Sequence, residues 1–68
     1  MKKYYRVEIV YTGLLGMASG NTFTHYAESQ PQNTTDHEPM KDTHKAYFVD
    51  PVEAEKYRQK TLEAILPH

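Results

Sequence analysis

The sequence predicts a small α+β domain in which a three-stranded antiparallel β-sheet carries one C-terminal α-helix on one face, in the order β-β-β-α. Residues 4–12 alternate β-branched and aromatic residues in the pattern of a half-buried strand. A similar run at residues 22–28 follows a glycine-containing stretch, which favours a hairpin. The run Asp50-Pro51-Val52-Glu53 is typical of a helix start.

The first expected strand has two distinct faces. The face expected to meet the core carries Tyr5, Val7, Ile9 and Tyr11. The opposite face carries Tyr4, Arg6, Glu8 and Val10. Gly13, Gly16, Ser19 and Gly20 then mark a turn, because glycine readily adopts the backbone angles that turns require.

The second expected strand alternates in the same way, and its more apolar side is assigned to the core. That side carries Phe23, His25 and Ala27, whereas the other carries Thr22, Thr24 and Tyr26. Residues 29–43 contain two prolines and many polar side chains, which predicts a long exposed loop. Residues 44–49 form the third expected strand, with Ala46 and Phe48 on one face and Tyr47 and Val49 on the other.

The expected helix runs from Pro51 to about residue 66 and stops before Pro67. Asp50 is placed to cap the first turn. One broad arc of this helix is expected to lie on the sheet: Ala54, Tyr57, Thr61, Leu62, Ala64 and Ile65. Arg58 falls inside the arc, where its stem is expected to pack on apolar surface while the guanidinium reaches water. The alternative for Arg58 is a contact with a partner.

Composition limits the classes of function. The chain has 68 residues, which suits one domain spanning 1–68, and it has no cysteine for a disulfide or thiolate site. We expect neither a secretory signal nor a membrane span and therefore a cytoplasmic protein, because charged residues and tyrosines follow Met1. The formal net charge of −1 gives no strong field for nucleic acid.

Histidine and carboxylate side chains supply the atom types of a metal site: His25, His37, His44 and His68, with Asp36, Glu38 and Asp42. Their spacing does not match a metal motif, because 36–38 are consecutive loop residues. We expect no metal and no cofactor. No pattern sets an activated nucleophile beside a base, so we expect that the protein is not an enzyme.

One helix covers only one face of a sheet, so the other face carries a surplus of apolar and aromatic residues. The candidate partner-binding residues are Tyr4, Arg6, Val10, Tyr26, Tyr47 and Arg58. They predict a non-enzymatic domain that acts by binding and occluding another protein, and inhibitors encoded by phages or mobile elements, such as anti-CRISPR proteins, are one such class. A homodimer through the sheet face or an edge strand is a second expectation.

The competing interpretation is a module for single-stranded nucleic acid. Its stacking platform would consist of Tyr4, Tyr26 and Tyr47, with positive charge from Lys2, Lys3, Arg6 and Lys45. Glu8, Glu28 and the net charge weaken this alternative, because phosphate contacts normally dominate such binding.

Overall fold

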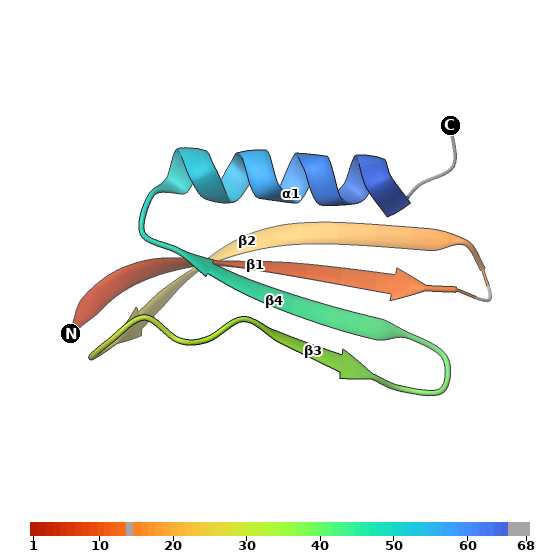
Figure 1. The fold of residues 1–68 in the computed structure, drawn as a ribbon, viewed down its shortest axis with the longest axis horizontal. Helices are drawn as coiled ribbons and strands as arrows, with labels where there is room; N and C mark the ends of the chain where they lie inside the picture. The colour runs from red at the N-terminus through yellow and green to blue at the C-terminus, as the bar shows by residue number, and fades with distance from the viewer. Residues whose placement is uncertain (14, 66–68) are drawn as a thin grey trace.

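The computed structural model describes residues 1–13 and 15–65, which form a four-stranded antiparallel sheet followed by one C-terminal helix packed on it (Figure 1). The elements are β1 (Lys2–Thr12), β2 (Met17–Ala27), β3 (Thr34–His37), β4 (Asp42–Phe48) and α1 (Pro51–Ile65). The strand order is β2-β1-β4-β3. Within the described part of the chain, no helix has the length and apolar character needed to cross a membrane.

The predicted hairpin forms, but β2 begins at Met17, five residues before its expected start at residue 22, so Ser19 and Gly20 lie in the strand and not in the turn. β1 and β2 pair continuously from Lys2 opposite Ala27 to Thr12 opposite Met17. In the turn, the Gly16 amide donates to the Gly13 carbonyl at 3.2 Å, and Gly16 has a φ of 63°. Glycine adopts this left-handed conformation without the steric cost of a Cβ.

The prediction of three strands is wrong, because a fourth strand, β3, lies inside the segment expected to be a loop at 29–43. It pairs with β4 from Thr34 opposite Lys45 to His37 opposite Asp42, and β4 begins two residues earlier than predicted. All four β3 residues are exposed, so no apolar alternation marks the strand in the sequence. Backbone pairing with the free edge of β4 stabilises it instead.

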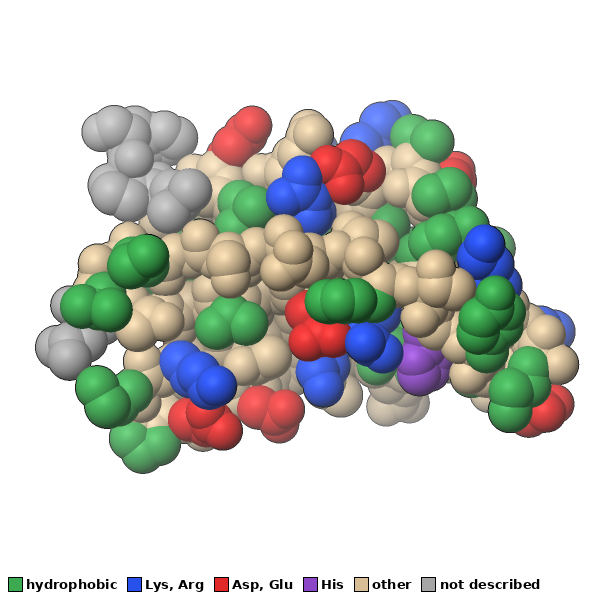
Figure 2. Space-filling model, turned by 180° about the vertical axis from the view of Figure 1, so that it is seen from behind, with side chains coloured by type: hydrophobic (Ala, Val, Ile, Leu, Met, Phe, Trp, Pro, Cys, Tyr) green, Lys and Arg blue, Asp and Glu red, His purple; other side chains and the backbone are tan. Residues whose placement is uncertain are grey.

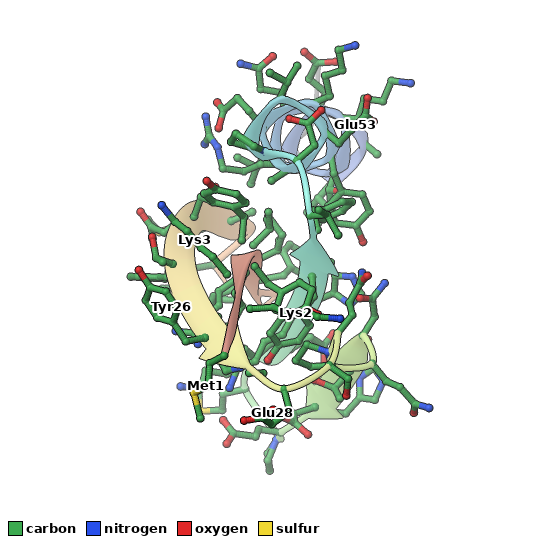
Figure 3. The ribbon with its side chains drawn as sticks, turned by 90° about the vertical axis from the view of Figure 1, so that its left-hand side faces the viewer. Met1, Lys2, Lys3, Tyr26, Glu28 and Glu53 are labelled. Carbon is green, nitrogen blue, oxygen red and sulfur yellow. The ribbon has the colours of Figure 1, made fainter. Side chains whose placement is uncertain are left out.

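The chain between β2 and β3 crosses one end of the sheet, because these two strands occupy opposite edges. Figure 3 shows this connector passing Glu28 on the side of the sheet away from the helix. It is tied to β4 at Tyr47, whose carbonyl accepts from the Gln30 side chain and whose amide donates to Asn33 Oδ1, both at 3.0 Å. The crossover thereby covers part of that end of the sheet.

The helix start and the core agree with the prediction. The Val52 amide donates to Asp50 Oδ1 at 2.9 Å, which is the expected cap. Val7, Ile9 and Ala54 are buried at the centre of the core. The partly buried residues around them are Tyr5, Phe48, Tyr57, Leu62 and Ile65. Ala64, expected in the same arc, is exposed, and residue 66 lies outside the described residues.

The assignment of the two faces of β2 is wrong. Thr22 lies opposite Val7 and Gly20 opposite Ile9, so the even-numbered residues of β2 share the helix side of the sheet. The helix lies close to the strand at Gly20, where an added Cβ would be 2.7 Å from Ile9 Cδ1 and 3.1 Å from Leu62 Cδ1. A small residue is needed at this contact, and that requirement outweighs the apolar character of Phe23.

Candidate binding surface on the open face of the sheet

The face of the sheet turned away from α1, the open face, collects side chains from three strands. The pairings place on it Tyr4, Arg6, Glu8 and Val10 of β1, Phe23 and His25 of β2, and Thr43, Lys45 and Tyr47 of β4. Three of the six candidate binding residues lie here in partly exposed positions: Arg6, Val10 and Tyr47.

Arg6 occupies the middle of this surface. It lies opposite Phe23 on one neighbouring strand and opposite Tyr47 on the other. Its Cζ atom is 5.2 Å from the centre of the Phe23 ring, which is a cation–π contact. Its Nε donates to Glu8 Oε2 at 2.7 Å, so a neighbouring carboxylate balances the guanidinium charge. An arginine held in this way presents a planar, oriented surface.

His25 links the two sides of the open face. Its Nδ1 lies 3.2 Å from Arg6 Nη1, and because a guanidinium can only donate, Nδ1 is the acceptor of this hydrogen bond. The His25 ring also meets the Tyr47 ring edge to face, with centroids 5.2 Å apart. These contacts connect side chains of β2 and β4 across β1 into one continuous surface.

The structure separates the remaining candidates from this surface or buries them. Tyr4 is on the open face beside His25 but only 5% exposed, so little of its side chain is accessible to a partner. Tyr26 is 59% exposed but lies opposite Lys3 on the helix side of the sheet (Figure 3). The tyrosine platform expected from Tyr4, Tyr26 and Tyr47 is therefore not a single surface.

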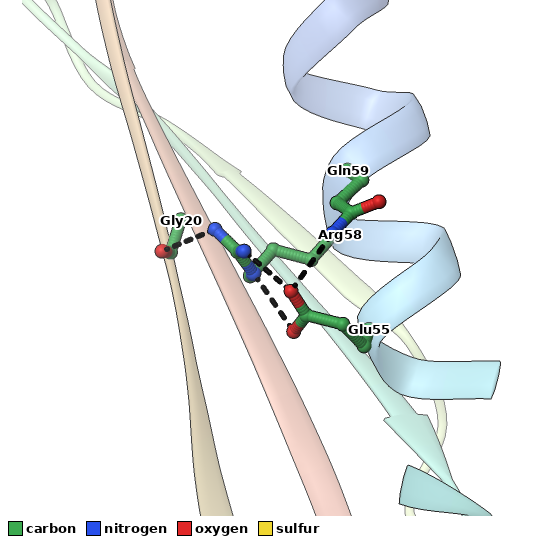
Figure 4. A network of polar contacts seen from close by, with 4 residues as sticks. All are labelled: Gly20, Glu55, Arg58 and Gln59. Atoms are coloured by element: carbon green, nitrogen blue, oxygen red, sulfur yellow. Dashed lines mark hydrogen bonds and ion pairs between the residues drawn. The ribbon is translucent and has the colours of Figure 1, made fainter. Parts of the chain in front are cut away.

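Arg58 lies on the helix side, where Figure 4 shows its network. Its Nη2 and Nε donate to Glu55 at 2.5 and 3.0 Å, and Nη1 donates to the Gly20 carbonyl at 3.4 Å. The hydrogen bond from Arg58 lowers the pKa of the Glu55 carboxyl below its usual value. The Arg58 stem lies close to Gly20, and its guanidinium, which the sequence predicted to reach water, bonds Glu55 and the Gly20 carbonyl and so ties α1 to β2.

The histidines of β3 and β4 make separate polar contacts. His44 binds Thr35 Oγ1 through Nδ1 at 2.8 Å and the Tyr57 hydroxyl through Nε2, which connects β3, β4 and α1. His37 Nδ1 pairs with Asp42 Oδ1 at 2.8 Å. Over residues 1–13 and 15–65, no group of three histidine or carboxylate side chains is arranged to hold a metal ion. His68 lies outside the described residues.

Positive charge on the open face is balanced. Lys2, Arg6 and Lys45 lie on this face, whereas Lys3 is on the helix side with its Nζ 5.4 Å from the centre of the Tyr5 ring. Glu8 bonds Arg6 and lies directly opposite Lys45, and a second carboxylate, Asp36 of β3, lies on the same face opposite Thr43. The middle of the face is therefore close to neutral.

Comparison of the chain with protein-family models, curated proteins and solved structures found no match. The geometry of the open face is therefore the basis for a functional proposal. Sequence reasoning missed Phe23, because its apolar character assigned it to the core. The alternation of 22–28 was correct, and only the direction of the two faces was reversed.

Proposed function

We propose that this chain is a small protein-binding domain whose open face docks on a partner protein. The observation that carries the proposal is the cluster of Phe23, Arg6 and Tyr47 on the sheet face opposite the helix. Phe23 is 43% exposed and lies against the oriented Arg6 guanidinium. Aromatic residues and arginine dominate the binding energy of protein interfaces, whereas a solvated sheet face normally carries polar residues.

A protein fits this surface better than nucleic acid does. Phosphate binding requires uncompensated positive charge, and its affinity depends on the counterions that the cations release. Glu8 neutralises Arg6, and Asp36 lies on the same face as Lys45, so the centre of the open face offers little free charge. A partner with an apolar patch and a hydrogen-bond acceptor near its centre would complement Phe23 and Arg6.

Binding itself is the proposed activity. A sheet braced by a helix on its other side presents the open face as a firm surface, which limits the entropy lost on docking. The protein would then occlude a functional surface of its partner, as an inhibitor of the phage or mobile-element class does, anti-CRISPR proteins included.

The test is capture of a partner from bacterial lysate by the immobilised chain, followed by affinity measurement with the purified partner. Phe23→Ala should weaken the affinity by about 30-fold, the effect of losing a central aromatic contact worth about 2 kcal/mol. Tyr26→Ala is the matched control, because Tyr26 is equally aromatic and exposed but lies on the helix side, and it should leave the affinity unchanged.

Equal affinities for wild type and the Phe23→Ala variant would refute the assignment of the open face. A different result would support the nucleic-acid alternative: low-micromolar binding of a single-stranded oligonucleotide that falls steeply with salt and is weakened by Arg6→Ala.

A further inference from the structure

The outer edge of β2 is long, regular and uncharged. β2 is a terminal strand of the sheet, and its pairing with β1 runs through eleven consecutive residue pairs without a bulge. Its sequence, MASGNTFTHYA, contains no lysine, arginine, aspartate, glutamate or proline. An exposed strand edge presents unpaired backbone amides and carbonyls, which are able to bind another strand.

The opposite edge of the same sheet is built differently. β3 has only four residues, includes Asp36, and lies between Pro31 and Pro39. Short length, charge and nearby proline are the features that natural proteins use to prevent strands from adding to a sheet edge. β3 carries these features and β2 does not, so the two edges differ in their capacity to accept another strand.

Figure 2 looks onto the β2 side of the molecule. A band of uncharged side chains and backbone crosses this view, with charged side chains above it, on the helix side, and below it. Met17, Phe23 and Tyr26 of β2 are 61%, 43% and 59% exposed. The band therefore combines free backbone groups with apolar side chains that a second strand would cover.

We propose that β2 pairs antiparallel with β2 of a second copy of this chain, about a two-fold axis near Thr22 at the middle of the strand. The product is a continuous eight-stranded sheet with both helices on the same face. In such a pairing, residues near the axis lie beside the same residues of the second copy, so any charge near the axis would face an identical charge. β2 has no lysine, arginine, aspartate or glutamate, so self-pairing meets no such repulsion.

The surroundings of β2 are compatible with this two-fold arrangement. With Thr22 on the axis, Phe23 faces Asn21 of the second copy, and Thr24 faces its Gly20, which are pairings without steric or charge conflict. On the helix side Arg58 pairs with Glu55 and donates to the Gly20 carbonyl of β2 in a long hydrogen bond of 3.4 Å, which a second strand would share or displace. Two copies therefore bring balanced charges together on that side.

The experiment measures mass by sedimentation equilibrium from micromolar to millimolar concentration. The wild-type mass should rise from 7.9 kDa toward twice that value. Thr22→Lys places like charges near the axis and should raise the dimer dissociation constant about tenfold or more. Thr34→Lys makes the same change on the β3 edge and should have no effect. Mixing the Thr22→Lys and Thr22→Glu variants should restore dimers, which also demonstrates that both variants fold.

Amide hydrogen exchange locates the interface. Alternate amides of β2, those directed outward, should become protected as concentration rises, because in an antiparallel pair every second residue bonds to a given neighbour. A monomer throughout the concentration range would overturn the proposal. So would a dimer that withstands Thr22→Lys but is lost in Tyr47→Ala, since self-association would then use the open face. The β2 edge and the open face are tested by different variants, so failure of one proposal leaves the other standing.

Discussion

The contact between α1 and β2 at Gly20 has a measurable consequence for stability. A Cβ added by Gly20→Ala would lie 2.7 Å from Ile9 Cδ1 and 3.1 Å from both Arg58 Cγ and Leu62 Cδ1. The first distance is far below van der Waals contact, so the Ile9 side chain or the helix must move. Ile9 is only 2% exposed and has little space in which to change rotamer.

The magnitude follows from two opposing effects. Inserting a methyl group into a packed core costs about 1–3 kcal/mol of unfolding free energy. Replacing glycine in a strand recovers roughly 0.5–1 kcal/mol, because alanine has less backbone freedom to lose on folding. Because a 2.7 Å contact is severe, the cost of insertion lies in the upper part of its range, about 2–3 kcal/mol. Gly20→Ala should therefore destabilise the domain by about 1–2.5 kcal/mol, a large share of the roughly 3–5 kcal/mol that a core of this size supplies.

The assay is urea denaturation followed by circular dichroism, with Gly13→Ala as the control. A Cβ at Gly13 would lie 3.7 Å from Tyr11 Cε1, an ordinary contact, so this variant should match or exceed the stability of wild type. With a urea slope of about 1 kcal/mol/M, the Gly20→Ala midpoint should fall by about 1–2.5 M.

A second substitution tests the cause. Ile9→Val removes the Cδ1 atom that the new methyl group would meet, at a cost of about 0.5–1.5 kcal/mol in the wild-type background. Because the two changes compensate in volume, the Gly20→Ala, Ile9→Val double variant should be more stable than the sum of the single effects predicts. A Gly20→Ala variant as stable as wild type, or strictly additive effects, would refute the close-packing argument.

Two further predictions concern the core and the helix surface. Ile9→Ala should cost about 2–5 kcal/mol and unfold much of the population, because Ile9 is one of the two largest fully buried side chains; a urea midpoint equal to that of wild type would contradict this. Arg58→Gln should raise the pKa of Glu55 toward its usual value, as measured by NMR titration of its side-chain carboxyl, because Arg58 is the main cause of the lowered pKa. The Arg58–Glu55 pair is exposed and stabilises the fold only slightly; this stabilisation is present above the pKa of Glu55 in the unfolded chain and is lost as the pH falls through the lower pKa in the folded chain. Arg58→Gln should therefore weaken the pH dependence of stability. An unchanged Glu55 pKa would count against the contact.

Local sequence patterns were sufficient to predict β1, β4 and α1. The alternation of Val7 and Ile9 marks the buried side of β1, and the Asp50-Pro51 pair marks the helix start. Both signals arise from interactions within a few residues: side-chain alternation in a strand and capping of free amides. The core side of the sheet and the helix that covers it are therefore evident from the sequence.

The location of the candidate site was only partly predictable. Alternation separates the two faces of β2 but does not say which one meets the helix, and a shift of one residue exchanges them. In the structure the close approach of Leu62 to Gly20 determines that the Gly20 side of β2 meets the helix, and this places Phe23 on the open face. Tyr4, expected to be exposed, is buried on the open face opposite His25.

The sequence by itself determined the α+β class, the β1–β2 hairpin and the C-terminal helix. Tertiary structure alone decided that polar residues 34–37 form a strand, because their backbone groups pair with β4 and their side chains carry no burial signal. It also decided which aromatic residues share the open face, because strand register and the fit of the helix over Gly20 depend on contacts between distant parts of the chain.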